Sequence, residues 1–492
     1  MSQRTREIGA LLLLLILFAL TYTYNLGGWL ISDDEGTDLY EAWQFQQGKI
    51  PGVDFAAEQQ PLYLFAGKAV LNLAGHQVAP LRLLSAIQVL AGSFILALAV
   101  RRIWGSLPAL LTLGLILSSG IIIEVSRIFR PDPMMLAWEM VGLAAILLAT
   151  HAQSRRWWAV AGAAYGMAVL LKPFGVLPVL GFILFFLLEF WRRRAVWRVV
   201  LLDGLTFSAL FLLVGAGVSG WLYGRTGFYY QEIFNQHASL IEEVHLLFRL
   251  SVMLRYYGAL FLVNGIFIFI LPLALLNRKR KEMPAAPMRL LLWQLVVPLV
   301  FVGFPRPFFM RYYIFVIPAL AVILARQMQI TYEKIPIRHK QWTMPLFVLL
   351  PLLFALFATR PRPSSLLLRH ETDTQVIADF VVTHTTPDDL LLSDYAMINF
   401  LANRASIYEA SIIAAGRIQG GIITGELLIQ RMTETPVALV MLHLPGGEKE
   451  PDHLYYLQDY GRFRTYLDQH YTRLQTFNRQ GQYIELYQRQ EK

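Results

Sequence analysis

Apolar segments long enough to cross a lipid bilayer recur along most of this chain. A helix crosses about 30 Å of hydrocarbon with roughly 20 apolar residues. By that measure the sequence holds about eleven candidate spans, at residues 8–30, 81–100, 107–124, 134–150, 157–172, 174–191, 199–222, 251–276, 290–304, 312–325 and 342–358. The fifth and sixth are short and meet at Lys172-Pro173, so they could instead form a re-entrant pair. The sequence therefore predicts a polytopic α-helical membrane protein.

The composition agrees with a chain that is solvated mostly by lipid. Hydrophobic residues make up 56% and charged residues only 16%, whereas soluble globular proteins are about a quarter charged. The net charge of +9 could suggest nucleic-acid binding, but the basic residues occur in short clusters between apolar runs, as in cytoplasmic loops. The absence of cysteine excludes disulfides, thiolate catalysis and cysteine-based zinc sites.

The basic clusters fall in alternate connections, which predicts the orientation. With a cytoplasmic N-terminus, the cytoplasmic side holds Arg101-Arg102, Arg155-Arg156, Arg192–Arg194 with Arg198, Arg278–Lys281 and the segment 326–340. This distribution follows the positive-inside rule. Arg4 and Arg6 precede the first run, which we interpret as a retained span rather than a cleaved signal peptide. We expect a multi-pass protein of a prokaryotic plasma membrane, with a eukaryotic internal membrane as the alternative.

The C-terminal part differs in kind from the rest. An odd number of spans places residues 359–492 on the extracytoplasmic side, after a linker-like segment at 360–365. Its pattern predicts helices at 372–383 and 452–471 and strands at 389–393, 437–444 and 483–487. We therefore divide the chain into a transmembrane domain, 1–358, and a soluble α/β domain, 359–492. No catalytic signature is apparent in the second, and its glycines do not form a dinucleotide-binding motif.

The first external connection, residues 32–80, is the most informative segment. It is far longer than the connections of most helical bundles, and it begins with Asp33-Asp34-Glu35 directly after the first span. The apolar side chains at 39, 40, 43 and 45 predict a helix that lies on the membrane surface. A turn at Gly48–Phe55 follows, and a second helix begins near Pro61. The three acids alone could be no more than a polar border to the span.

These residues resemble the first external loop of the GT-C glycosyltransferases, in particular the protein O-mannosyltransferase and aminoarabinose-transferase branch. The matching stretches are DDEGTDLYEAWQFQQGKIPGVDF and QQPLYLFAGK, in which Asp34-Glu35, Gly48–Phe55 and Pro61–Tyr63 follow the order and spacing of the family. Two departures stand out: Asp33 precedes the usual pair of acids, and Gln59-Gln60 replaces a frequent histidine. The resemblance covers roughly residues 1–358 and implies a GT-C-like fold of about eleven transmembrane helices.

The resemblance also implies the site. The loop at 127–132 is similar to the family's second acidic site, Lys172 follows a small-residue helix as in the family, and Arg311-Tyr312 matches its late Arg-Tyr pair. The catalytic candidates are then Asp34 as the base, with Glu35 and Asp132 for orientation or acceptor binding. The candidates for the donor phosphate are Arg130, Lys172 and Arg311, and those for other substrate contacts are Tyr312 and Asp54.

These residue types suit transfer of a sugar from a lipid phosphate. A carboxylate accepts the proton of the attacking hydroxyl, and fixed cations stabilise the phosphate that leaves. A purely structural alternative remains for each cation: Arg130 could pair with Asp132, and Arg311 could anchor the chain at the interface. The loop 224–250 holds His237, Glu242-Glu243 and His245, but their spacing fits no standard ligand set. We expect no metal or other cofactor, although a divalent cation is possible.

The sequence thus favours a membrane glycosyltransferase that acts with inversion. Its expected partners are a polyprenyl-phosphate sugar, membrane lipids and an extracytoplasmic acceptor, which could be a glycan, a lipid or a protein. The alternative is a transporter or lipid flippase with an external accessory domain, for which Glu139 is the one candidate mid-span charge we identify in the sequence. A scaffold protein is a third hypothesis, but it gives the acids of the first loop no purpose.

Overall fold

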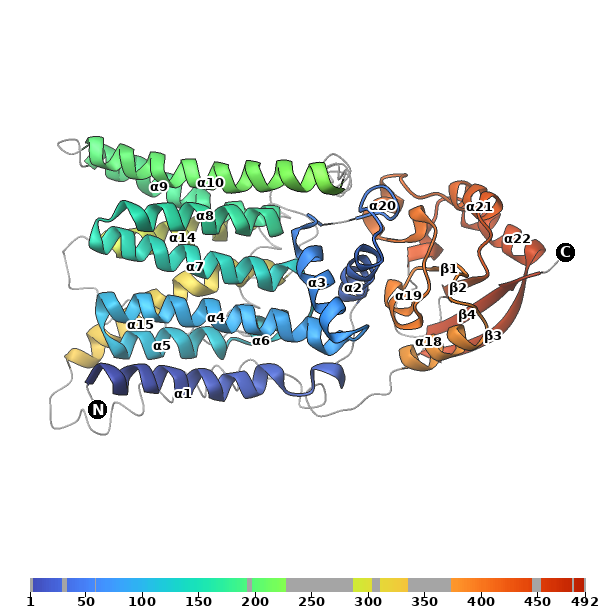
Figure 1. Ribbon diagram of the computed structural model, residues 1–492, viewed down its shortest axis with the longest axis horizontal. Helices are drawn as coiled ribbons and strands as arrows, with labels where there is room; N and C mark the ends of the chain where they lie inside the picture. Colours follow the sequence, from blue (N-terminus) through green and yellow to red (C-terminus); the bar gives the residue numbers. More distant parts are fainter. Residues whose placement is uncertain are drawn as a thin grey trace, which may run out of the picture. The chain divides into compact units, whose positions relative to one another are not determined.

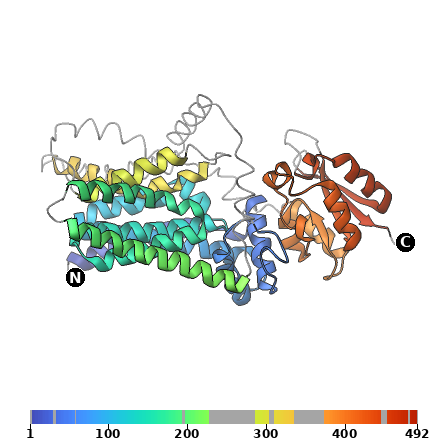
Figure 2. The same cartoon turned by 90° about the horizontal axis from the view of Figure 1, so that it is seen from above.

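The chain is mostly helical and forms two compact units (Figures 1 and 2). The computed structural model describes residues 3–28, 33–57, 59–192, 197–226, 286–302, 310–334, 373–444, 453–479 and 482–490. The first unit, here the bundle unit, comprises residues 1–26, 82–221 and 243–367. The second, the sheet unit, comprises residues 27–81, 222–242 and 368–492. Each is described by itself.

The bundle unit is built of long helices that run side by side (Figure 1). Its described elements are α1 (Gln3–Thr23), α4 (Val78–Trp104), α5 (Ser106–Leu117), α6 (Gly120–Ser126), α7 (Pro131–Ala152), α8 (Arg155–Leu171), η2 (Pro173–Gly175), α9 (Val176–Arg192), α10 (Trp197–Thr226), α14 (Ala286–Val302), η5 (Met310–Val316) and α15 (Ile317–Glu333). Within the described residues, six helices are long and apolar enough to cross a membrane, or seven spans if the bent α5–α6 pair counts as one.

Most predicted spans have a helical counterpart, and one is broken. The predicted span at 107–124 consists of α5 and α6, which meet at an angle of 63°. The helix breaks because Ser119 adopts an extended backbone conformation ahead of Gly120. Residues 173–192 by themselves form a helix that is long and apolar enough to cross a membrane, which does not support the re-entrant alternative. The predicted spans 251–276 and 342–358 lie outside the described residues, so the number of eleven stays a prediction.

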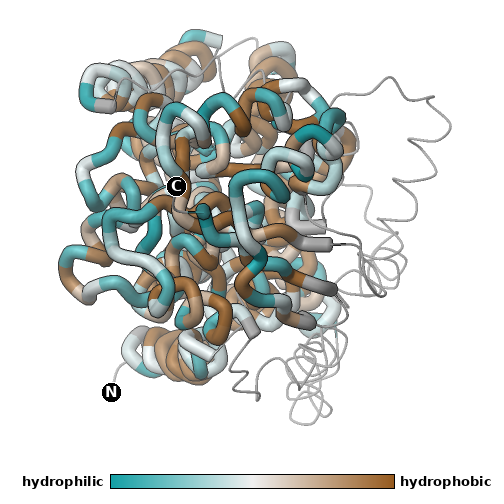
Figure 3. Tube along the Cα trace, turned by 90° about the vertical axis from the view of Figure 1, so that its right-hand side faces the viewer, coloured by the Kyte–Doolittle hydropathy of each residue, from teal (hydrophilic) through white to brown (hydrophobic). Residues whose placement is uncertain are grey.

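The outer helices present apolar side chains where a soluble protein would present polar ones. On α1, Leu13, Leu17 and Leu20 are each more than half exposed. On α10, Leu212 and Leu213 are exposed to a similar degree. Figure 3 shows hydrophobic stretches along the helices and hydrophilic ones on many connections. Large contiguous apolar surface of this kind is typical of helices that face lipid.

Glycines allow neighbouring helices of the bundle to approach closely. A Cβ added at Gly162 of α8 would lie 2.2 Å from the carbonyl oxygen of Phe207 on α10. One added four residues later, at Gly166, would lie 3.0 Å from the carbonyl oxygen of Phe211. The two glycines share one face of α8 and form the small-xxx-small pattern that brings membrane helices into backbone contact. The α8–α10 contact therefore depends on the absence of side chains at these positions.

The sheet unit contains a four-stranded sheet with helices around it (Figure 1). Its C-terminal elements are α18 (Asp373–Thr383), β1 (Leu391–Ser393), α19 (Ala396–Ala402), η6 (Tyr408–Ala410), α20 (Ala415–Gln419), α21 (Gly425–Glu434), β2 (Leu439–Leu444), η7 (His453–Tyr456), α22 (Tyr460–His470), β3 (Tyr471–Arg479) and β4 (Gln482–Arg489). The strand order is β1-β2-β4-β3, with β1 and β2 parallel and the other pairs antiparallel. The three predicted strands correspond to β1, β2 and β4, and β3 was not predicted.

The first external connection belongs to the sheet unit. Both of its predicted helices are present, as α2 (Asp33–Gln46) and α3 (Leu62–Ala74). The apolar side chains at 39, 40, 43 and 45 are buried, and α2 packs on α3 and α19. The Tyr40 hydroxyl accepts a hydrogen bond of 3.0 Å from the Ser406 amide, and the Ala56 amide donates one of 2.8 Å to Ser411. The prediction that this face lies on the membrane surface is therefore wrong.

That error arises because periodicity shows that one face of a helix is apolar, but not what covers it. Gly36 illustrates how closely α2 is seated: a Cβ added there would lie 2.7 Å from the Cβ of Met397 on α19. The connection 27–81 thus groups with residues 368–492 in one compact unit. The predicted division between 358 and 359 lies outside the described residues and stays a prediction.

Candidate functional site

The N-terminus of α7 places a carboxylate at the end of a helix in the bundle unit. Pro131 occupies the first helical position, where its lack of an amide hydrogen costs nothing, and Arg130 precedes it in an extended conformation. Asp132 follows in the first turn of the helix. A negative charge is stabilised there by the helix dipole and by amides that have no partner within the helix. The sequence Arg-Pro-Asp therefore fixes both charged side chains at this helix end.

Lys172 joins this pair from the end of α8. Its Nζ lies 2.7 Å from Oδ1 of Asp132, whose Oδ2 lies 3.5 Å from Nε of Arg130. The exposed fractions of Arg130, Asp132 and Lys172 are 4%, 1% and 5%. Two cations thus flank one carboxylate, which leaves this buried trio with a charge of +1. Buried charges in membrane proteins are costly and commonly mark functional sites.

Aromatic rings lie beside the trio. The Nζ of Lys172 is 5.9 Å from the ring centroid of Tyr312, and the rings of Tyr312 and Phe174 are 4.6 Å apart. Tyr312 is partly exposed and comes from η5, just ahead of α15. The side chain of Arg311, the third predicted phosphate ligand, lies outside the described residues. Four of the eight predicted site residues thus lie together in the bundle unit: Arg130, Asp132, Lys172 and Tyr312.

The geometry bears on both interpretations of the cations. The structural alternative, in which Arg130 pairs with Asp132, is present as an ion pair. The same contacts also hold two cations in fixed positions beside one carboxylate, an electrostatic arrangement that suits an incoming phosphate. The roles assigned to these residues remain predictions.

The predicted acids of the first connection begin α2 in the sheet unit. Asp34 is exposed and Glu35 is fully buried. The side chain of Asp33 lies outside the described residues. Asp54, a predicted substrate ligand, is exposed on the turn before α3, where its carboxylate accepts a hydrogen bond of 2.7 Å from the Ile50 amide. That contact gives Asp54 a structural role in the turn.

Sequence reasoning missed a second group of acids on α2. Asp38 and Glu41 are buried, and the Tyr63 hydroxyl of α3 donates a hydrogen bond to Glu41. Burial, together with the negative charges of Glu41 and Asp38, raises the pKa of Tyr63 well above its usual value, so this phenol keeps its proton at neutral pH. The spacing of positions 34, 38 and 41 places them on one helix face, which was the available signal.

Two fully buried arginines were also missed. Arg82 donates to the Leu26 carbonyl at 2.6 Å, and Arg127 donates to the Tyr24 carbonyl at 2.7 Å and also to that of Thr21. The last carbonyls of a helix have no partners within the helix, so Arg127 satisfies the end of α1, and Arg82 contacts the short 3-10 turn that follows it, Leu26–Gly28. Their role is structural. Within the part of the chain that the structure describes, no group of three or more His, Asp or Glu side chains could hold a metal ion.

Comparisons with known proteins agree with the resemblance. Residues 58–221 match the family described as dolichyl-phosphate-mannose-protein mannosyltransferase. A search of curated proteins found no match.

Solved structures match over nearly the whole chain. ArnT from Cupriavidus metallidurans, bound to undecaprenyl phosphate, matches with a TM-score of 0.66 and 16% identity over 96% of this chain and 97% of that chain. Its apo state gives a TM-score of 0.67 and 16% identity over 99% and 98%. The oligosaccharyltransferase AglB from Archaeoglobus fulgidus, in complex with an inhibitory peptide and a dolichol-phosphate, gives 0.57 and 13% over 89% and 70%. At such identities the matches establish a shared fold.

Proposed function

We propose that this chain, a membrane protein with the GT-C glycosyltransferase fold, transfers a sugar from a polyprenyl-phosphate donor to an extracytoplasmic acceptor with inversion. The observation that carries the proposal is the buried trio of Arg130, Asp132 and Lys172, which places two cations beside one carboxylate at the ends of α7 and α8. The fold shared with ArnT and the family match over residues 58–221 support the same reaction class.

The reaction is a single displacement at the anomeric carbon. A hydroxyl oxygen of the acceptor attacks this carbon while its proton passes to a carboxylate, for which we propose Asp34. The bond between the anomeric carbon and the phosphate oxygen breaks, and polyprenyl phosphate leaves as an anion. Attack from the face opposite to the leaving group inverts the configuration.

The cations act on the leaving group. Lys172 and Arg130 are held by Asp132, so they need little reorganisation when negative charge develops on the phosphate. We assign Arg311 to the same phosphate and Tyr312, next to Lys172, to a contact with the donor. Glu35 and Asp54 complete the set as groups that orient the acceptor or its loop. We place the reaction on the extracytoplasmic side of a plasma membrane, because the basic clusters favour a cytoplasmic N-terminus.

The test measures release of free polyprenyl phosphate by the purified full chain. A panel of polyprenyl-phosphate sugars is offered together with crude membrane acceptors, and wild type is compared with Asp34→Asn and Lys172→Ala. We expect release by wild type and at least a hundredfold slower release by Asp34→Asn, as for loss of a general base. The control is Asp379→Asn, which removes an exposed carboxylate of α18 and should keep wild-type activity.

The outcomes separate the roles. Wild-type release by the Asp34 variant would refute the proposed base. A chain that binds none of the lipid-phosphate sugars would refute the transferase and favour the transporter. If Lys172→Ala raises KM for the donor while the variant stays folded, the assignment of this lysine to the phosphate is supported.

A further inference from the structure

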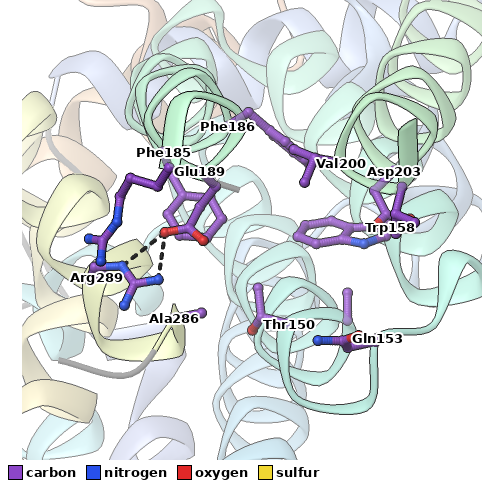
Figure 4. A pocket seen from close by; sticks show the side chains of 13 residues that line it. Thr150, Gln153, Trp158, Phe185, Phe186, Glu189, Val200, Asp203, Ala286 and Arg289 are labelled. Atoms are coloured by element: carbon purple, nitrogen blue, oxygen red, sulfur yellow. Dashed lines mark hydrogen bonds and ion pairs between the residues drawn. The ribbon is translucent and has the colours of Figure 1, made fainter. Parts of the chain in front are cut away.

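A polar cavity lies in the bundle unit, far from the trio. It has a volume of about 360 Å³ and is lined by side chains at the C-terminal ends of α7 and α9, on the first turns of α8 and α10, and at the start of α14 (Figure 4). Thr150, at the end of α7, is about 27 Å from Asp132 along the helix, at a rise of 1.5 Å per residue. The cavity therefore lies at the opposite end of α7 from the candidate site.

The cavity wall is charged on two sides. On one side Glu189 of α9, 4% exposed, accepts a hydrogen bond of 2.9 Å from Nε of Arg289 on α14. On the other side Asp203 of α10 lines the cavity together with Trp158 (Figure 4) and pairs at 3.8 Å with Arg155, which lies outside the lining. Arg192 also lines the cavity. The lining thus holds two arginines and two acids, and Arg192 is the lining charge for which the described residues show no ion pair, so a ligand anion is favoured beside it.

Trp158 gives an independent indication of a ligand. Its side chain is 4% exposed and lines the cavity. Its Nε1 donor has no hydrogen-bond partner among the described residues. A buried indole N–H normally finds an acceptor, and a phosphate oxygen in the cavity would supply one.

The polar cavity continues into an apolar groove. A second cavity, of about 400 Å³, lies between α9 and α10 and shares Phe186 and Val200 with the first. Apart from Ser208 and Gly204, its lining is made of aliphatic and phenylalanine side chains. A ligand that fills both spaces must carry an anionic head and a hydrocarbon tail.

We propose that the two cavities form a binding site for an anionic glycerophospholipid of the surrounding membrane. Its phosphodiester lies between Arg192 and Arg289 and accepts a hydrogen bond from Trp158. One acyl chain lies in the groove between α9 and α10. Because the site is at the opposite end of α7 from Asp132, it is distinct from the proposed donor site and occupies the other leaflet.

Native mass spectrometry of the full chain in detergent tests this proposal without any assay of transferase activity. The probes are dioleoyl phosphatidylglycerol, dioleoylglycerol, which lacks the phosphate, and inorganic phosphate. We expect the phosphatidylglycerol to bind at least tenfold more tightly than either of the others. Weaker binding, by threefold to tenfold, is expected for Arg192→Gln and Trp158→Phe, each of which removes one donor to the phosphate.

Of two further variants, one tests the apolar groove and the other is a control. Gly204→Leu fills the groove, because a Cβ at this position is only 3.7 Å from the Phe186 ring, and it should reduce binding of phosphatidylglycerol. Arg156→Gln removes an exposed charge beside Arg155, in the same connection but outside the cavity lining, and should bind as wild type does.

Four results would overturn the proposal. They are equal binding of dioleoylglycerol, equal binding of inorganic phosphate, unchanged binding by both Arg192→Gln and Trp158→Phe, and complete displacement of phosphatidylglycerol by an equal concentration of undecaprenyl phosphate. The last result would make the cavity a second site for the carrier lipid.

Discussion

The ion pair between Lys172 and Asp132 predicts that substitutions at these two positions have strongly non-additive effects on the free energy of unfolding. Asp132→Asn removes the negative charge but keeps an oxygen that can accept from Lys172. The lysine and Arg130 then lose the carboxylate that both of them contact. Breaking a buried ion pair by removing one partner costs about 3–5 kcal/mol. Because the amide still accepts a hydrogen bond, we expect a loss of about 3 kcal/mol for this variant.

A Lys172 variant and the double variant complete the double-mutant cycle. Lys172→Met leaves Asp132 with Arg130 at 3.5 Å and should cost less, about 2 kcal/mol, because part of the charge compensation remains. The double variant removes both charges and should be less destabilised than Asp132→Asn alone. The free energy of coupling between the two positions is then about 2–3 kcal/mol. At 2.7 Å the Coulomb attraction is about 6 kcal/mol at an effective dielectric constant of 20. The expected coupling is smaller because desolvation of the two charges opposes this attraction.

The assay is reversible unfolding of the full chain in mixed micelles, followed by circular dichroism for all four proteins. Polyprenyl phosphate release is measured on the same samples. We expect the double variant to regain stability but not activity, because Lys172 remains absent. Additive losses, with Asp132→Asn within 1 kcal/mol of wild type, would refute the argument that the carboxylate stabilises the two cations.

Two other expectations concern packing and pH. Gly162→Ala should destabilise the bundle by at least about 2 kcal/mol, because the new Cβ would meet the Phe207 carbonyl; Gly215→Ala, on an open face of α10, should be neutral or slightly stabilising in the same unfolding assay. Burial lowers the pKa of His76 below 6.5, although its contact with the Phe400 carbonyl opposes the shift. The folded state therefore binds fewer protons than the unfolded chain, and the sheet unit should lose stability as the pH falls from 6.5 through the folded pKa. The protection factors of the α19 amides against hydrogen exchange, at pH 7.5 and pH 5, measure this loss of stability. If these protection factors fall equally with pH in His76→Gln, the assignment to His76 is contradicted.

Much of the bundle could be predicted from the sequence because lipid imposes a simple rule on hydropathy and length. The rule fails where the chain bends within the membrane region, as at Ser119, because two short helices have the same hydropathy as one long helix. It also does not show which protein surface covers an amphipathic helix, so the burial of Tyr40 and Trp43 within the sheet unit was not foreseen.

The residues of the candidate site were predicted, but only one of their contacts was. The sequence offered the Arg130–Asp132 pair as a structural alternative, whereas the contact between Lys172 and Asp132 depends on how α7 and α8 pack. Asp38 and Glu41 were missed because their spacing shows only that they share a helix face with Asp34, and not that this part of the face is buried. Strand β3 was missed because its polar residues resemble the end of the preceding helix, and because an irregularity between Arg473 and Gln475 interrupts its pairing.

The way α1 ends has a consequence for how freely this part of the sequence can vary. Arg82 and Arg127 hold the carbonyl groups of Thr21, Tyr24 and Leu26, and a carbonyl is present whatever side chain the residue carries. The two arginines therefore bind backbone groups, and these contacts do not depend on the side chains of the residues that carry them. The exposed side chains of α1 can therefore diverge without moving the end of the helix, whereas the two arginines and the buried Leu11, Phe18 and Tyr22 are constrained.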